Sequence, residues 1–143
     1  PGPPPPPAGM AQPTAGCIDV AVCGAHMLGL PLNGQLTSRG AWHVASTRTA
    51  PGYRLYALPG GPPARPGMVR DASGGALEIE IWRVPQEHFG SFVQGIPEPL
   101  GIGRVRTESG QDVAGFLCEG AGIAGAQDIT ALGGWRAYLA RQR

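Results

Sequence analysis

The chain has 143 residues, a formal net charge of +1 and 42% hydrophobic residues. This length is typical of one domain with its own core, and the small charge argues against binding to nucleic acid or to an anionic membrane surface. No apolar run approaches the roughly 20 residues of a membrane helix, and no signal-peptide pattern is present.

The cysteines indicate a reducing compartment. Cys17, Cys23 and Cys118 are odd in number, lack metal-ligand spacing and lie in apolar surroundings. We therefore expect three reduced, buried thiols in a cytoplasmic protein, with neither a metal site nor a cofactor.

Residues 1–16 are predicted to be a linker. Seven of the 16 prolines fall within the first 13 residues, which is typical of a stiff, extended spacer of about 3.1 Å per residue. The chain does not begin with methionine, so we interpret it as a piece of a longer protein, in which residues 17–143 form the folded domain.

Residues 20–33 are the most informative stretch. An apolar run ends at Gly24, and a histidine, His26, follows two residues later. Apolar runs closed by glycine are typical of buried strands, so His26 is predicted to stand where a strand opens into a loop, outside the packed interior. Two interpretations remain open, a functional histidine and a histidine that only packs at the end of the strand.

Five further strands are predicted. Apolar runs bounded by turn residues indicate strands at residues 42–49, 53–58 and 76–84, and a hairpin of residues 101–107 and 112–119. In the third of these strands Leu77, Ile79 and Ile81 alternate with Glu78, Glu80 and Trp82. This period of two predicts a half-buried strand with both glutamates on its exposed face.

Two helices complete the predicted elements. Pro85 opens a short helix, because proline is tolerated in a first turn. Asp128 suits the N-cap of another helix, which Gly133 and Gly134 divide into two short pieces. Residues 34–41 are expected to form a polar loop, and residues 59–67 a turn-rich connection.

These elements predict an α+β fold, a small mixed β-barrel, closed or nearly closed, with short flanking helices. Polar side chains gather in the loop after the first strand and on the next strand pair. They could bind a small polar or anionic ligand, or could simply solvate a loop and cap its turns. The candidates are Asn33, Gln35, Thr37, Ser38, Arg39, Thr49, Tyr53 and Arg54.

Several long motifs resemble one family. They are GAHMLGLPLNGQLTSRGA (residues 24–41), TAPGYRLYALPG (49–60), GIPEPLGIG (95–103), GFLCE (115–119) and DITALGGWRAYLA (128–140). The chain resembles the C-terminal domain of allophanate hydrolase, which is related in fold to the γ-glutamylcyclotransferases.

The resemblance implies a step in urea degradation. An upstream amidase domain would release N-carboxycarbamate, and this domain would decarboxylate it towards ammonia and carbon dioxide. The chain contains no amidase signature. His26 is the catalytic residue that the resemblance carries over, while the mismatched surroundings of Glu98 argue against cyclotransferase activity.

The chemistry suggests roles for the remaining candidates. Loss of CO₂ leaves electron density on the nitrogen, and histidine has the nearest suitable pKa for delivering a proton there. Donors must hold this small dicarboxylate, and the predicted binding residues are Gly24, Ala25, Asn33, Gln35, Arg39, Tyr53 and Arg54. The alternative is a non-catalytic module that supports the assembly or stability of the amidase, and a homo-oligomer also remains open.

Overall fold

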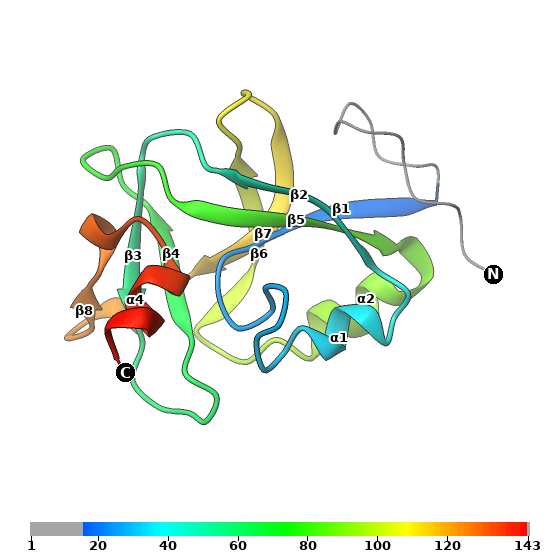
Figure 1. The fold of residues 1–143 in the computed structure, drawn as a ribbon, viewed down its shortest axis with the longest axis horizontal. Coiled ribbons are helices and arrows are strands. Elements are labelled where there is room, and N and C mark those ends of the chain that lie inside the picture. Colours follow the sequence, from blue (N-terminus) through cyan, green and yellow to red (C-terminus); the bar gives the residue numbers. More distant parts are fainter. Residues whose placement is uncertain (1–15, 143) are drawn as a thin grey trace.

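The computed structural model describes residues 16–142, so the predicted linker lies outside the described residues apart from Gly16. The described part contains two β-sheets flanked by short helices, an α+β architecture (Figure 1). The α+β prediction is therefore confirmed.

The larger sheet has five strands in the order β2-β5-β1-β7-β6. Its central strand β1 (Cys17–Val22) runs antiparallel to β5 (Glu78–Pro85) and parallel to β7 (Asp112–Cys118). The edge strands are β2 (Trp42–Arg48) and β6 (Leu100–Arg106). Because β1 has a neighbour on both sides, the loop that follows it starts inside the molecule.

The smaller sheet has three strands in the order β4-β3-β8. They are β4 (Pro66–Arg70), β3 (Tyr53–Ala57) and the two-residue β8 (Gln127–Asp128). β4 packs closely on β7, since a Cβ at Gly67 would come within 2.8 Å of the Cys118 sulfur. The turn signals of residues 59–67 concealed the start of β4, which the sequence analysis did not predict.

The expected barrel is not closed. The edge strands β2 and β6 meet at their C-terminal ends, where the Ala50 N–H donates to the Arg106 carbonyl at 2.9 Å and the Glu108 N–H donates to the Arg48 carbonyl at 2.9 Å. Elsewhere in the described residues, the strands pair within two separate sheets. The sheet therefore curls until its edges touch at one end, which fits the nearly closed form and not the closed one.

The helices are short. α2 (Gln86–Gln94) begins directly after Pro85, as predicted, and packs on β1 and β5. The last helical segment is divided at Gly133 and Gly134 into η1 (Thr130–Leu132) and α4 (Trp135–Arg141), which confirms the predicted division. The predicted N-cap is wrong, since Asp128 lies in β8 and Ile129 is the N-cap of η1.

Two further helical turns were not predicted. α1 (Gly34–Thr37) occupies part of the expected polar loop, and α3 (Gly120–Ile123) follows β7. Each has only four residues, too few for a hydrophobic period to be read from the sequence.

One prediction about β5 is wrong. Glu80 is not on an exposed face, since its residue is only 4% exposed and Trp82, on the same face, is 2% exposed. Loop 23–33 and α4 cover this face, and Glu80 bonds to both. Strand alternation shows which residues share a face but does not show what covers that face.

Candidate functional site

His26 lies in a folded loop, residues 23–33, that follows β1. The Met27 N–H donates to the Gly24 carbonyl at 3.0 Å, and the Leu32 N–H donates to the Ala25 carbonyl at 2.8 Å. Gly24 is needed for close approach, because a Cβ there would overlap the ring of Pro66 at the start of β4. The loop is therefore fixed both by its own hydrogen bonds and by contact with the second sheet.

The His26 ring is buried among aromatic side chains. The residue is 6% exposed, and its ring centroid lies 5.4 Å from that of Phe92 and 4.8 Å from that of Phe116. The expectation that His26 lies outside the packed interior is therefore wrong. Phe92 comes from α2 and Phe116 from β7, so only the tertiary structure brings them to the ring.

Gln35 fixes the orientation of the imidazole. The His26 Nε2 lies 2.9 Å from the Gln35 Oε1. An amide oxygen only accepts, so Nε2 carries a hydrogen and Nδ1 is left to take up or release a proton. Burial lowers the pKa of His26, the Gln35 hydrogen bond opposes this effect, and the positive charge of Arg65 lowers the pKa further.

Asn33 and Arg39 support the same loop and its neighbours. The Asn33 Nδ2 donates to the His26 carbonyl at 2.8 Å. The Arg39 guanidinium donates to the Gln35 carbonyl at 2.8 Å and to the Ser91 hydroxyl of α2 at 3.0 Å. Both residues hold the surroundings of His26 in place rather than lining its cavity.

Tyr53 and Arg54 lie elsewhere. The Tyr53 hydroxyl accepts hydrogen bonds from Arg70 at 2.8 Å and from the Arg106 N–H at 2.9 Å. Arg54 forms ion pairs with Asp71 at 3.3 Å and with Asp128 at 2.9 Å. The structure does not bring these two side chains to the cavity of His26.

A small cavity of about 20 Å³ adjoins His26, which is room for about one water molecule. Gly24, Ala25 and His26 line it, and their backbone N–H groups have no acceptor among the described residues. Free N–H groups that converge on a cavity are suited to binding an oxyanion. Gly24 and Ala25 are two of the predicted binding residues, and their role as donors to a ligand stays a prediction.

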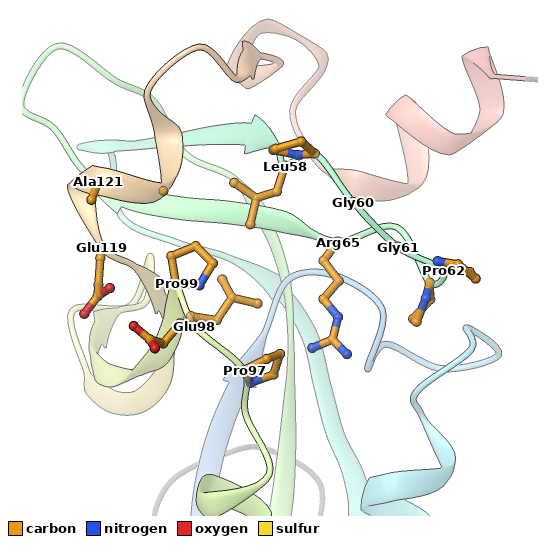
Figure 2. A pocket seen from close by; sticks show the side chains of 14 residues that line it. Leu58, Gly60, Gly61, Pro62, Arg65, Pro97, Glu98, Pro99, Glu119 and Ala121 are labelled. Carbon is orange, nitrogen blue, oxygen red and sulfur yellow. The ribbon is translucent and has the colours of Figure 1, made fainter.

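A larger cavity of about 600 Å³ lies next to it and shares Arg65 and Leu100 with it. Its walls come from the proline-rich loop before β4 and from the segments around Glu98 and Glu119 (Figure 2). Arg65 stands across the cavity from the two glutamates in this view. Arg65 is not among the predicted binding residues, since its segment was predicted only to be a turn-rich connection.

Glu80 is a second residue that the sequence analysis missed. Its carboxylate accepts from the Leu28 N–H at 2.8 Å, the Trp82 indole at 3.0 Å and Arg136 at 2.8 Å. Burial would raise the pKa of Glu80, but the hydrogen bonds from Arg136, Leu28 and Trp82 outweigh it and lower the pKa. The bulky apolar Trp82 on the same strand face was the signal that this face is covered.

The described residues contain no group of three or more His, Cys, Asp or Glu side chains arranged to hold a metal ion. The three cysteines are free and buried, and burial raises the pKa of Cys23 to about 12. Such a thiol is protonated and unreactive at neutral pH. No helix in the described part of the chain has the length and apolar character needed to cross a membrane.

Solved structures are similar to this chain, some in both fold and sequence and one in fold alone. The structure of Kluyveromyces lactis allophanate hydrolase has a TM-score of 0.84 and 41% identity over 88% of this chain and 21% of that chain. A uropathogenic E. coli-specific protein has a TM-score of 0.80 and 34% identity over 87% of this chain and 96% of that chain. A gamma-glutamyl cyclotransferase is similar in fold alone, with a TM-score of 0.53 and 11% identity over 78% of this chain and 69% of that chain.

Sequence comparison leads to the same family. The chain is 47% identical to the urea amidolyase of Saccharomyces cerevisiae over 127 residues, which cover 85% of this chain and 7% of that protein. The chain thus spans a small part of the length of this relative. The sequence profile of the allophanate hydrolase C-terminal domain matches residues 18–140, which include the His26 loop, both sheets and nearly all of α4. The chain therefore belongs to the allophanate hydrolase C-terminal domain family.

Proposed function

We propose that this domain decarboxylates N-carboxycarbamate, with His26 as general acid. The observation that carries the proposal is a buried histidine, held by Gln35, beside free backbone N–H groups in a member of this family. In the reaction the bond between the nitrogen and one carboxylate carbon breaks, and its electron pair stays on the nitrogen. A proton from His26 then converts the dianion into carbamate and CO₂, and the imidazole regains its proton from solvent.

The low pKa of His26 has a consequence for this step. The free enzyme holds the imidazole neutral at neutral pH, because burial and Arg65 disfavour the cation. A bound dianion brings negative charge next to the ring and favours its protonated form. Binding of the substrate therefore supplies the charge that makes His26 an acid.

The remaining candidates take supporting roles. The backbone N–H groups of Gly24 and Ala25 would hold the carboxylate that stays on the nitrogen. Gln35 orients the imidazole, and Asn33 and Arg39 hold the loop and α1 in place. Tyr53 and Arg54 have no role in this proposal, since their polar atoms are engaged elsewhere.

The proposal includes a partner. An amidase domain would supply N-carboxycarbamate, and the urea amidolyase and allophanate hydrolase of Kluyveromyces lactis carry the matched domain within much longer chains. Residues 1–16 would link the two domains, with the folded unit at residues 17–143.

The first test supplies a separately prepared amidase domain with allophanate and measures the appearance of the second ammonia. Adding the chain is expected to accelerate it. His26→Phe is expected to lower the rate of decarboxylation about 10²–10⁴-fold, which is the usual contribution of a general acid. This variant keeps an aromatic ring between Phe92 and Phe116, and the exposed amide of Gln35 can turn to water.

The matched control is His88→Phe, which changes an exposed histidine on α2 and is expected to leave the rate unchanged. An unchanged rate with His26→Phe would remove His26 from the chemistry. If the parent chain itself gives no acceleration, the enzymatic proposal fails and the non-catalytic module remains.

A further inference from the structure

The two cavities differ in size, and this difference limits where a ligand can bind. The cavity beside His26 holds about one water, so a molecule with two carboxylates cannot occupy it alone. The adjoining cavity of about 600 Å³ is within the usual range for small-molecule sites. A ligand that reaches His26 must therefore extend into the larger cavity, past the residues shared by both.

Arg65 is one of those shared residues, and it is the one arginine among the residues that line either cavity. Its guanidinium has no hydrogen bond or ion pair within the described part of the chain. By contrast, Arg54, Arg106 and Arg136 all bond to carboxylates. Arg65 therefore presents unused, planar donors at the junction of the cavities, and such donors bind a carboxylate in bidentate fashion.

The backbone holds Arg65 at this junction. Its carbonyl accepts from the Leu58 N–H at 3.1 Å, which ties the two ends of the proline-rich loop together. The next residue, Pro66, contacts Gly24 closely and fixes the start of β4 against the His26 loop. The position of Arg65 next to His26 thus follows from sheet packing rather than from a mobile side chain alone.

The charged side chains of the larger cavity favour one end of it for an anionic ligand. Glu98 and Glu119 line the wall across from Arg65 (Figure 2). Their carboxylates repel a dianion, while the guanidinium attracts it. An anionic ligand is therefore attracted to the end of the cavity at Arg65, which also lines the cavity of His26.

We propose that Arg65 is the anchor for one carboxylate of a small dicarboxylate, which it receives in the larger cavity, while the other carboxylate reaches the backbone N–H groups of Gly24, Ala25 and His26. This inference deepens the proposed function and rests on it for the identity of the substrate. The anchor itself is a binding property, so it can be tested without turnover.

The test measures binding of malonate, a stable dicarboxylate, to the whole chain by calorimetry. Arg65→Gln is expected to weaken binding about 10- to 100-fold, the usual range for hydrogen bonds to a charged group. Arg65→Lys keeps the charge but loses the planar fork, and is expected to fall between the parent and Arg65→Gln. The control is Arg104→Gln, an exposed arginine outside both cavities, which is expected to bind malonate as the parent does.

A second readout requires no ligand. Burial lowers the pKa of His26 and the charge of Arg65 lowers it further, so Arg65→Gln is expected to raise this pKa in an NMR titration, while Arg104→Gln leaves it unchanged. This shift shows that the variant is folded and that the two residues are close in solution.

The outcomes separate the anchor from the reaction. Malonate affinity within about twofold of the parent in Arg65→Gln, or a parent chain that does not bind malonate, overturns the anchor. If malonate binding depends on Arg65 but the chain does not accelerate decarboxylation, the anchor stands and the proposed function fails. If the chain accelerates decarboxylation and Arg65→Gln does so equally well, the anchor fails and the function stands.

Discussion

His26 combines two roles that usually conflict, since it packs like a core residue and has a polar partner. Its ring lies between Phe92 and Phe116, and Gln35 bonds to Nε2. Burial of a titratable group favours its neutral form, so the folded state binds the His26 proton more weakly than the unfolded state does. Folding and protonation are therefore coupled at this residue.

The sign of this coupling gives a prediction. The pKa of His26 is lowered from 6.5, so at and below that pH the unfolded state binds more protons than the folded state. The contribution to stability is fully present above pH 6.5 and is lost as the pH falls through the folded pKa. We expect the free energy of unfolding of the parent to fall more between about pH 7.5 and 5.5 than that of His26→Phe.

Urea unfolding at the two pH values measures this difference. If the parent and His26→Phe lose the same free energy of unfolding over this interval, His26 is not neutral and buried in solution.

The lowered pKa of His26 also affects activity, because the free enzyme loses the protonated imidazole as the pH rises. The value of kcat/KM for decarboxylation is therefore expected to fall as the pH rises, and the fall is expected to begin below pH 6.5.

At the scale of elements, Glu80 joins three segments that are distant in the sequence. From β5 its carboxylate accepts from Leu28 in the His26 loop and from Arg136 in α4. Arg136 also donates to the Leu28 carbonyl at 2.8 Å. The C-terminal helix thus holds the tip of the His26 loop through a buried carboxylate.

This connection predicts that α4 controls the order of the loop. Arg136→Leu leaves the buried Glu80 with one donor fewer and frees the Leu28 carbonyl, so we expect a loss of about 1–3 kcal/mol of stability. We also expect faster hydrogen exchange at the Leu28 amide, which bonds to Glu80, and weaker binding of malonate.

Arg141→Leu is the matched control, because Arg141 lies exposed in the last turn of the same helix. It is expected to leave the exchange of Leu28 as it is in the parent. Equal protection of the Leu28 amide in Arg136→Leu and in the parent would show that α4 does not hold the loop.

At the scale of the whole molecule, a related structure shows that this fold can make up nearly a whole chain. The uropathogenic E. coli-specific protein is matched over 96% of its own length, so a protein of this size can consist of this fold. The two sheets share a core that includes Val20, Met27, Leu55, Ile81 and Trp135. One shared core predicts one cooperative unit.

Residues 17–143 alone are therefore expected to unfold in urea in a single transition, with an m value of about 1–3 kcal/mol/M. Far-UV circular dichroism reports the sheets and helices, and fluorescence reports Trp42, Trp82 and Trp135 in β2, β5 and α4. Coincident midpoints are the expected result. Separate midpoints would show that α4 and the sheets unfold independently.

Local pattern was enough to predict most of the elements. The apolar run before Gly24, the alternation around Ile79 and Ile81, and the hairpin of residues 101–107 and 112–119 each depend on neighbours in the sequence. The long family motifs added the family and the prediction that His26 is catalytic. The same reasoning failed for β4, β8, α1 and α3, which are short or hidden among turn residues and carry too few side chains for a period.

The sequence by itself therefore determined the family, the main strands and the backbone segment at Gly24, Ala25 and His26. Only the tertiary structure decided what surrounds that segment. It placed Phe92 and Phe116 on the imidazole, brought Arg65 to the junction of the cavities and buried Glu80 under α4. The physical reason is that secondary structure follows from nearby residues, whereas burial, charge and cavity shape arise where segments far apart in the sequence pack together.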